Sequence, residues 1–481
     1  MALPTTPPAR PATHRLFARP ELLIVLAIGA FVRFWQLFTP RAVVFDEYHY
    51  LRYSGHYFSH RFYFDLHPPL AKLLYAGLAK LLSIPQAVLL HPYPAPALRI
   101  MPALCGTLTV ALVYILLTQL GGSRPIAALG ALAVALDNAL VADSRLILLE
   151  PLLIFFGLLG VVCFFAARSR TGAARWSLLV ASGVASGCAA SVKWTGLSAL
   201  GLILCIWLYD WLRARSWRPR AFLPPVILAG LSVAVYLVCF AIHFSLLTKS
   251  SEGTDDDFVS IQYRATLNGD LLYNPNARIS FLARLRDTQR AIDYSNRELE
   301  AATHPGASPW YTWPIMKHPI GMWISPGKAP PGRAQPFIIL LGNPVVWWGG
   351  LVGIGLAILL LAWWRARVRP YRFALAVLLG GYAINYLPFI PITRLMYLYH
   401  YLFALIWIAM LGALTIGIVG GWAEQPDDAS WRFPSARSRV TYAAIVALIV
   451  IGFVYFSPFT YGFGLSSRAY DQHFWVLHPH L

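Results

Sequence analysis

Charged residues are scarce in this 481-residue chain, and acidic residues are the scarcer kind. Asp, Glu, Lys and Arg together make up 12% of the sequence, whereas 58% is hydrophobic and 14% is aromatic. Soluble globular domains carry roughly 25% charged residues. The composition therefore excludes an ordinary soluble domain and indicates a polytopic membrane protein.

Cysteine is also rare, and a processing signal is lacking. All five cysteines lie in stretches that we predict to span the membrane, which favours packing over a disulfide framework or a zinc site. A long apolar run follows the Pro-rich, basic N-terminus without an obvious small-residue cleavage site, so we expect an uncleaved anchor. The paired, interrupted spans that are typical of inverted-repeat transporters are not seen either.

A membrane-spanning helix needs about twenty predominantly apolar residues. Eleven stretches meet this requirement, with polar breaks between them. We therefore predict an all-α polytopic membrane protein with about eleven transmembrane helices, organised as one membrane-embedded domain over residues 1–481. The predicted spans are 21–38, 97–120, 125–142, 145–167, 176–193, 195–211, 222–247, 336–362, 373–391, 399–422 and 440–458.

Arginine clusters alternate with loops of low charge. Short basic loops remain on the cytoplasmic side during insertion, and with eleven spans every cluster falls on one side. We therefore expect a multi-pass plasma-membrane protein with a cytoplasmic N-terminus. The net charge of +18 is then a topological signal and not a nucleic-acid footprint. The clusters are Arg10/Arg15/Arg19, Arg168/Arg170/Arg175, Arg213/Arg215/Arg218/Arg220, Arg365/Arg367/Arg369/Arg372 and Arg432/Arg437/Arg439.

Two long segments, residues 39–96 and 248–335, are expected on the outer face. Within the first, Leu70–Ile84 is rich in Leu and too short to span, so we predict a helix in the membrane interface with Lys72 on its polar side. The length of the second predicts a small ordered subdomain or lid. We interpret its acidic run, residues 255–257, as a solvated loop, because three adjacent aspartates lack the spacing of a metal site.

Residues of both charges converge on the outer face of this topology. Charged groups near bilayer depth are expensive unless they face a cavity or a partner, so we predict a polar site at the membrane surface. Mixed charges suit a reaction with an anionic leaving group, because cations hold a phosphate while a carboxylate accepts a proton. The residues concerned are Asp46 and Glu47 just after the first span, Asp65, Arg145, Lys193, His243 and Arg394.

Individual residues also have purely structural interpretations. Asp46 and Glu47 are equally well explained as a helix N-cap and its dipole partner. His67 precedes two prolines and fits a rigid turn. Arg145 and Lys193 are expected near helix ends, where isolated cations commonly reach toward lipid phosphates. The choice between a structural and a functional interpretation of these residues therefore depends on the motifs taken together.

Taken together, the motifs resemble those of the protein O-mannosyltransferases, enzymes that move mannose from a polyprenyl phosphate to Ser or Thr. The signature first loop has its counterpart in DEYHY followed by FDLHPPLAKLL, which ends at Leu74. Glu150 departs from the family pattern, which has Asp there. Further blocks in the family order are Leu136–Leu140, Ser144–Leu149, Ser191–Leu197, Ile242–Phe244, Trp310–Pro314, Leu341–Trp348, Tyr399–Tyr401 and Phe456–Gly462.

The resemblance implies the fold of the C superfamily of glycosyltransferases, a helical bundle with an extracytoplasmic active site. It is a resemblance to the bacterial branch, because the second outer segment is too short for the MIR domain of the eukaryotic enzymes. It also implies an inverting displacement, with Asp46 and Glu47 as the catalytic pair and Asp46 as the base. Arg145 is the first choice for the leaving phosphate. Further implied substrate-binding residues are Asp65, His67, Glu150, Lys193, His243, Arg394 and His400.

The implied donor is mannose linked through phosphate to a polyprenol or dolichol, which enters from the outer leaflet. The implied acceptors are Ser/Thr hydroxyls of secreted or membrane proteins, and the secretion translocon is one place where they would meet the enzyme. No cofactor and no metal is assigned, and a divalent-metal requirement stays open. The alternatives are a lipid or glycan mannosyltransferase with the same donor and, less favoured, a transporter.

Overall fold

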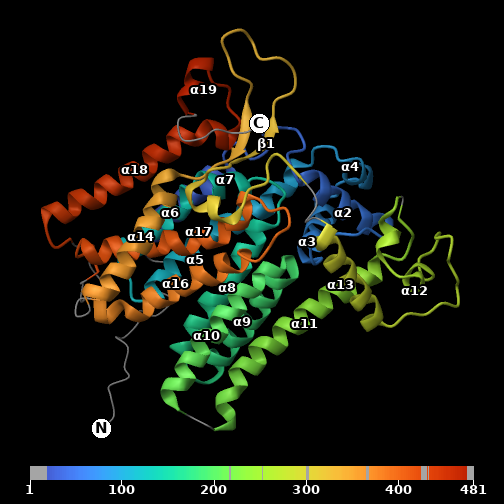
Figure 1. The fold of residues 1–481 in the computed structure, drawn as a ribbon, viewed down its shortest axis with the longest axis horizontal. Coiled ribbons are helices and arrows are strands. Elements are labelled where there is room, and N and C mark those ends of the chain that lie inside the picture. The colour runs from blue at the N-terminus through green and yellow to red at the C-terminus, as the bar shows by residue number, and fades with distance from the viewer. Residues whose placement is uncertain are drawn as a thin grey trace.

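The computed structural model describes residues 19–215, 218–251, 253–298, 303–364, 368–423, 431 and 433–473, and it is mostly helical. Most of the long helices form one bundle (Figure 1). The bundle consists of α1 (Pro20–Phe34), α5 (Ile100–Gln119), α6 (Arg124–Ala135), α7 (Asn138–Ser144), α8 (Glu150–Arg168), α9 (Gly172–Val192), α10 (Leu197–Ala214), α11 (Leu223–Leu246), α14 (Pro344–Trp363), α16 (Arg372–Tyr386), α17 (Leu402–Val419) and α18 (Ala436–Tyr461).

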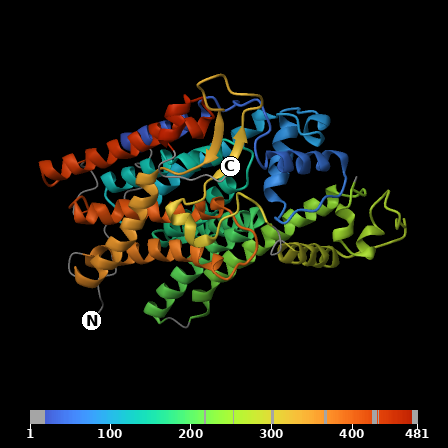
Figure 2. The same ribbon diagram turned by 45° about the horizontal axis from the view of Figure 1, so that its top comes forward.

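The remaining helices and strands lie beside one end of the bundle, as Figure 2 also shows. The helices among them are α2 (Glu47–Ser59), α3 (Leu70–Leu81), α4 (Gln86–Leu90), α12 (Ile261–Arg264), α13 (Phe281–Glu298) and α19 (Ser467–His473), and the strands are β1 (Ile320–Ile324) and β2 (Phe337–Leu340). Short 3-10 turns are η2 (Pro96–Arg99), η3 (Trp194–Gly196), η4 (Pro219–Phe222), η5 (Asp255–Phe258), η6 (Trp310–Ile315), η7 (Arg369–Tyr371), η8 (Leu387–Phe389) and η9 (Leu398–Tyr401).

The membrane-spanning character predicted from composition is confirmed. Eight helical segments of the described chain are long and apolar enough to cross a membrane, or nine if α6 and α7, which meet at a 59° bend, form one span. These correspond to nine of the eleven predicted stretches. The other two are helices as well, but α1 has only 15 residues and α9 is rich in Gly, Ala and Ser. Small residues let α9 approach its neighbours closely: a Cβ at Gly187 would lie 2.8 Å from Cα of Ser232 in α11.

Helix α17 forms the centre of the bundle and packs against α6, α14 and α16. The most apolar window of its span is 89% buried, whereas the corresponding windows of the α11 and α18 spans are 22% and 17% buried. A helix that is apolar all round lies either in a core or against lipid. We therefore assign α17 to the core and the exposed faces of α11 and α18 to the lipid.

A buried hydrogen-bond network around Asp137 joins α7 to α14 and α18. Its carboxylate accepts hydrogen bonds from the backbone N–H groups of Leu140 and Asn343, at 3.0 and 2.9 Å, and from the indole Nε1–H of Trp347, at 2.8 Å. The Asn343 amide donates to backbone carbonyls beside α6 and in α18. A buried carboxylate requires such partners. Two of the sequence blocks that resemble family motifs therefore have a structural role.

The predicted span at 336–362 is wrong at its start. Its first residues form β2, which pairs antiparallel with β1, with Ile320 opposite Leu340. Helix α14 begins only at Pro344, because the Asn343 side chain caps it and proline is favoured in the first helical turn. The apolar composition of β2 is that of a membrane span, and the strand pairing depends on a partner that local sequence does not reveal.

The helix predicted in the first outer loop is present as α3, but the predicted polar position of Lys72 is wrong. Lys72 is 1% exposed. Its ammonium forms an ion pair with Asp65 and donates a 2.6 Å hydrogen bond to the backbone carbonyl of His67. A buried ammonium group is tolerated here because these acceptors replace its hydrogen bonds to water. Through them, Lys72 fixes the loop that precedes α3.

Gly342→Ala should destabilise the protein through the Asp137 network. A Cβ at Gly342 would lie 1.8 Å from Nε1 of Trp347 and would displace the indole from Asp137. Overpacking of this kind costs about 1–3 kcal/mol, so we expect a lower thermal unfolding midpoint in detergent. Gly349→Ala is the control, because a Cβ there meets nothing within 4 Å. Equal midpoints for the two variants would contradict the role of the network.

Candidate active site

Two cavities share a wall formed by Tyr399 and His400. The first, which we call the carboxylate cavity, has a volume of about 360 Å³ and contains Asp46 and Asp65. The second, the lysine cavity, has a volume of about 320 Å³. The carboxylate cavity is also lined by Phe45, His49, Tyr50, Tyr53, Phe64, Leu66, His67, His304, Arg394, Leu395 and Tyr397.

Asp46 occupies the N-cap position of α2, but its side chain makes no capping hydrogen bond. The preceding residue, Phe45, has a left-handed backbone with φ of 51°, a conformation that costs energy in a non-glycine residue. Burial, followed by the negative charge of Glu150, raises the pKa of Asp46 to about 6 against the opposing charge of Lys193. The carboxylate is therefore open to the cavity and suited to act as a base near neutral pH.

Glu47 lines neither cavity, although it is adjacent to Asp46. Its carboxylate forms a bidentate ion pair with Arg99, at 2.7 and 2.8 Å, and accepts hydrogen bonds from the backbone N–H groups of Val44 and Ile147 at 2.9 and 3.0 Å. Both members of the pair are 1% exposed. Neighbouring residues on a helix project about 100° apart. These contacts favour a bracing role for Glu47 over direct participation in chemistry.

Asp65 and His67 both line the carboxylate cavity, and Lys72 holds both of them through the contacts described above. Burial, followed by the positive charges of Lys193 and Lys72, lowers the pKa of His67 well below its ordinary value. The imidazole is therefore neutral. It can orient a hydroxyl group by hydrogen bonding, but it supplies no positive charge to a phosphate.

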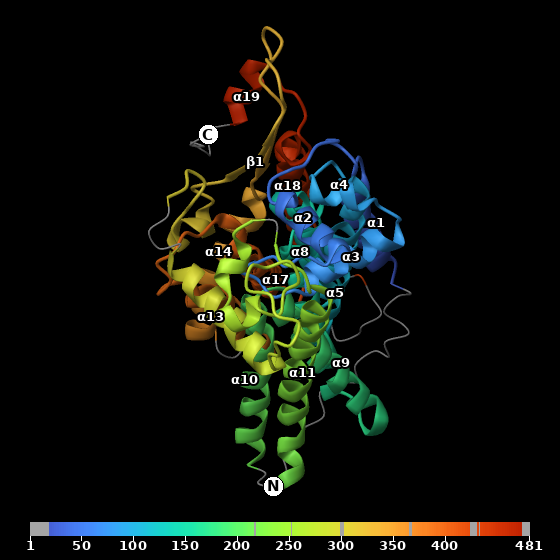
Figure 3. The ribbon, with the colours of Figure 1, turned by 90° about the vertical axis from the view of Figure 1, so that its right-hand side faces the viewer.

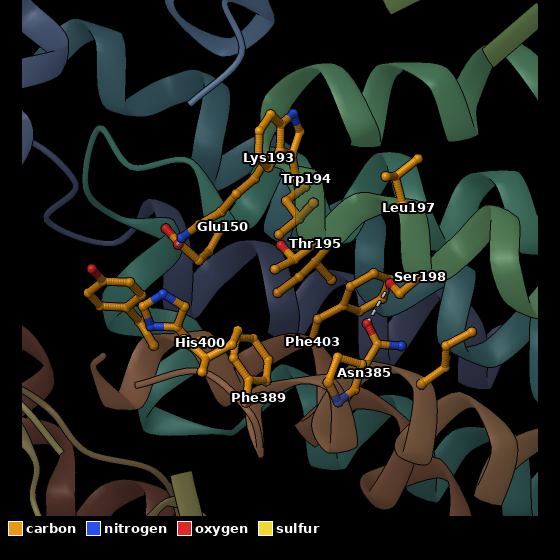
Figure 4. Close-up of a pocket in the computed structure, with 16 residues that line it drawn as sticks. Glu150, Lys193, Trp194, Thr195, Leu197, Ser198, Asn385, Phe389, His400 and Phe403 are labelled. Carbon is orange, nitrogen blue, oxygen red and sulfur yellow. Dashed lines mark hydrogen bonds and ion pairs between the residues drawn. The ribbon is translucent and has the colours of Figure 1, made fainter. Parts of the chain in front are cut away.

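The lysine cavity has one charged end and a largely apolar body. Lys193 and Glu150 form an ion pair of 2.7 Å at the charged end, and their side chains are 7% and 9% exposed. Figure 4 shows this pair on one side of the cavity, while Ser198 and Asn385, joined by a hydrogen bond of 2.7 Å, lie on the other. The apolar lining includes Leu153, Ile154, Leu197, Ile384, Phe389, Ile392 and Phe403. Such a cavity suits the head of an anionic lipid.

Arg394 lies between α16 and α17 and lines the carboxylate cavity. Within the described part of the chain, its guanidinium makes no ion pair or hydrogen bond, and burial lowers its pKa. His400 lines both cavities. Its Nδ1 is engaged by the backbone of Tyr397, and its ring stacks on Tyr399 with centroids 4.6 Å apart. The shared wall is thus held in place, and Arg394 is available to an anion.

The structure does not bring Arg145 or His243 into either cavity. Arg145 is 4% exposed; its guanidinium donates to backbone carbonyls at the end of α1, including that of Gln36 at 3.0 Å, and lies 4.4 Å from the ring centroid of Tyr461. His243 is hydrogen-bonded to the hydroxyl of Tyr57 at 2.8 Å within an aromatic cluster. These contacts are structural, because Arg145 donates hydrogen bonds to carbonyls that have no partner within the helix at its C-terminal end.

Several lining side chains are not identified from the sequence. Tyr399 forms part of the shared wall and Tyr397 lines the carboxylate cavity. Tyr399 falls in the motif block Tyr399–Tyr401, but neither tyrosine was predicted as a site residue. His304 comes from the segment 248–335 and packs edge-on against Tyr397 with centroids 5.5 Å apart. Its contact joins two segments about ninety residues apart in the chain (residues 304 and 397), so no local pattern predicts it. No group of three or more His, Cys, Asp or Glu in the described chain could hold a metal ion.

Two family models match the chain. Residues 23–248 match the model described as dolichyl-phosphate-mannose-protein mannosyltransferase, and residues 281–478 match the model described as the C-terminal four TMM region of protein-O-mannosyltransferase.

Individual relatives match over part of their length. Protein O-mannosyltransferase 1 of Drosophila melanogaster is 39% identical over 267 residues, which are 52% of this chain and 30% of that protein. The dolichyl-phosphate-mannose–protein mannosyltransferase 1 of Saccharomyces cerevisiae is 33% identical over 296 residues, 55% of this chain and 35% of the relative. The chain thus spans about a third of the length of these relatives.

Solved structures show the same fold. The S. cerevisiae protein O-mannosyltransferase Pmt1-Pmt2 complex bound to the sugar donor superposes with a TM-score of 0.83 at 19% identity, over 96% of this chain and 92% of that chain. ArnT from Cupriavidus metallidurans bound to undecaprenyl phosphate gives a TM-score of 0.51 at 15% identity, over 94% and 77% of the two chains. At these identities the likeness establishes the fold alone, and the predicted all-α polytopic fold is thereby confirmed.

Glu47→Gln should lower the thermal unfolding midpoint of the purified protein. The substitution leaves Arg99 buried without a counter-charge, and breaking a buried ion pair costs about 3–5 kcal/mol. Asp46→Asn is the matched control, since the Asp46 carboxylate has no such partner and burial already opposes its charge. Its midpoint should stay unchanged or rise. A larger loss for Asp46→Asn than for Glu47→Gln would overturn the division of roles between the two acids.

Proposed function

Because the chain belongs to the protein O-mannosyltransferase family, we propose that it transfers mannose from a polyprenyl-phosphate-mannose donor to Ser or Thr hydroxyls of polypeptides. The observation that carries this proposal is the pair of cavities on either side of the Tyr399–His400 wall. The carboxylate cavity holds Asp46, whose pKa is raised to about 6. The lysine cavity holds the Lys193–Glu150 ion pair next to an apolar lining. An acceptor hydroxyl and a lipid phosphate need these two environments.

The reaction is an inverting displacement at the anomeric carbon. The hydroxyl oxygen of the acceptor attacks from the side of Asp46, its proton passes to that carboxylate, and the bond from the anomeric carbon to the phosphate oxygen breaks on the far side. A β-linked mannosyl phosphate then becomes an α-linked mannoside and a polyprenyl phosphate. A general base is needed because a neutral hydroxyl is a weak nucleophile. Phosphate leaves as an anion and needs cations, not a protonated acid.

Arg394 and Lys193 are the cations that fit the leaving phosphate. Arg394 has an uncommitted guanidinium fork, which matches phosphate oxygens in a bidentate contact. Lys193 is already paired with Glu150, so its contribution is smaller until a phosphate competes for it. The apolar lining of the lysine cavity would hold the first isoprene units of the donor. Asp65, His67 and His400 would orient the sugar and the acceptor.

We also propose that this site faces away from the cytoplasm. The described arginines of the predicted clusters flank the helix ends opposite to those that carry the site residues. They are Arg19, Arg168/Arg170/Arg175, Arg213/Arg215/Arg218/Arg220, Arg369/Arg372 and Arg437/Arg439. Figure 3 shows the α10–α11 connection farthest from α2 and α3. Basic loops favour the cytoplasmic side. Five further arginines of these predicted clusters, at positions 10, 15, 365, 367 and 432, lie outside the described residues.

The proposal is tested by incubating the purified protein with a polyprenyl-phosphate mannose and a Ser/Thr-containing peptide. Mass spectrometry should show one added hexose per modified hydroxyl on the peptide. The comparison is a glycolipid or free glycan acceptor, incubated with the same purified protein and donor. Mannose on the lipid or glycan and none on any peptide would contradict protein mannosylation and support the alternative with the same donor.

Asp46→Asn should reduce transfer by about 10²–10⁴-fold, the usual loss for a general base. The raised pKa of Asp46 means that the carboxylate is protonated below about pH 6 and available as a base above it. Single-turnover transfer by the parent should therefore rise as the pH passes upward through about 6. Asp293→Asn, an exposed aspartate paired with Arg297, is the control and should behave as the parent. Near-normal transfer by Asp46→Asn would remove Asp46 from this role.

Arg394→Gln should weaken donor binding, whereas Arg145→Lys should not. Loss of a charge-assisted contact costs about 1.5–3 kcal/mol, or about 10- to 100-fold in affinity. Arg145→Lys instead loses the fork that holds the end of α1, so it should unfold at a lower temperature while the folded protein binds donor normally. Donor titration and thermal unfolding of both variants separate these outcomes. If Arg145→Lys weakens donor binding and Arg394→Gln does not, the phosphate binds at Arg145 instead.

A cysteine at Leu271 should react with an impermeant thiol reagent in intact cells, and one at Ala214 should not. Leu271 is 98% exposed in the second outer segment, and Ala214 ends α10 beside the arginines. Both cysteines are introduced after the five native ones have been replaced by Ala. Labelling at Ala214 without labelling at Leu271 would reverse the proposed orientation.

A further inference from the structure

A groove of about 540 Å³ lies between η5 and α13, separate from both cavities. One wall is a single face of α13, where residues recur at helical spacing. The other wall is the segment around η5. The groove is lined by Thr254, Asp257, Phe258, Ser260, Asp287, Arg290, Ala291 and Tyr294. None of these residues takes part in the reaction described above.

One aromatic pair separates this groove from the carboxylate cavity. Phe258 lines the groove, and its ring stacks on Phe64 with centroids 4.3 Å apart and an interplanar angle of 13°. Phe64 lines the carboxylate cavity and donates its backbone N–H to the carboxylate of Asp255 at 3.3 Å. Figures 1 and 2 place α12 and α13 beside α2 and α3 at the same end of the bundle. The groove and the carboxylate cavity are therefore adjacent, with the Phe64–Phe258 pair between them.

The groove offers aromatic faces and fixed hydrogen-bond acceptors. Phe258 is 38% and Tyr294 is 59% exposed, which is a large open aromatic surface. The carboxylate of Asp257 is oriented by Arg264 at 2.7 Å, and that of Asp287 accepts the hydroxyl of Ser260. Tyr and Phe provide contact area at small cost in side-chain entropy, and the carboxylates accept N–H groups. This combination suits an extended polypeptide.

We propose that this groove binds the acceptor polypeptide on one side of the hydroxyl that is modified. The inference rests on the proposed function and adds where the acceptor docks. A 360 Å³ cavity admits only a residue or two of an extended chain, so the flanking residues lie on the adjacent surface. A strand advances about 3.3 Å per residue, so we expect a residue a few positions from the hydroxyl to reach the groove beyond the Phe64–Phe258 pair. We expect a flat apolar residue such as proline to pack there against the exposed ring of Tyr294.

Binding of fluorescent peptides to the full-length protein in detergent, without donor, tests this directly. The probes are a nine-residue peptide with a central Thr and prolines four positions away on both sides, and its central three residues alone. We expect Tyr294→Ala to weaken binding of the long peptide about two- to tenfold and to leave binding of the short one unchanged. Tyr294→Phe, which keeps the ring, should bind as the parent does. Tyr273→Ala, 43% exposed in the same segment but outside the groove, is the matched control.

The inference is overturned if Tyr294→Ala binds the long peptide like the parent, or if Tyr273→Ala is equally impaired. Tighter, Tyr294-dependent binding of a mannosylated peptide than of the unmodified one would also overturn it, in favour of a carbohydrate site. The readout does not require turnover. Tyr294-dependent binding without any mannosyl transfer would refute the proposed function but not peptide binding in the groove. Transfer with no effect of Tyr294→Ala on the KM for the long peptide would refute peptide binding in the groove alone.

Discussion

The buried ion pair between Glu47 and Arg99 fixes the geometry on which the rest of the site depends. Arg99 belongs to the turn that leads into α5, and the same Glu47 carboxylate also accepts a hydrogen bond from Ile147, three residues before Glu150. One carboxylate therefore holds α2 and the start of α8 together. A buried pair of this kind adds little net stability compared with an apolar core, but it specifies one arrangement. That arrangement turns Asp46 toward the carboxylate cavity and Glu150 toward the lysine cavity.

In the proposed mechanism, separation from Lys193 preserves the Asp46 carboxylate as a base. A carboxylate in direct contact with Lys193 or Arg394 would have a depressed pKa and would be a poor base. Lys193 is instead neutralised by Glu150, across the Tyr399–His400 wall, and burial then dominates at Asp46 and raises its pKa to about 6. The wall thus lies between Asp46 and the Lys193–Glu150 pair, whereas Arg394 shares the carboxylate cavity with Asp46 and, within the described residues, forms no ion pair with it.

The sequence predicts those features that depend on composition or on short motifs. Apolar runs predict the membrane helices because hydrophobic length alone determines whether a segment can span. The first-loop motif predicts Asp46 because a carboxylate beside a predicted helix end is a local feature.

Arg145 and Lys72 show the limit of this reasoning. Both are isolated cations in the sequence, and only tertiary structure supplies the acceptors that bury them: carbonyls of α1 for Arg145, and Asp65 for Lys72. The same limit explains why β1–β2 and His304 were not predicted, since each depends on a partner remote in the chain.

A structure of the protein with polyprenyl-phosphate mannose and an unreactive acceptor peptide bound tests the central claim most directly. The account predicts the donor phosphate within hydrogen-bonding distance of Arg394 or Lys193, the isoprenoid against the apolar lining of the lysine cavity, and the acceptor position of the peptide hydrogen-bonded to Asp46 across the sugar. A donor phosphate bound at Arg145, or an acceptor placed out of reach of Asp46, would contradict it.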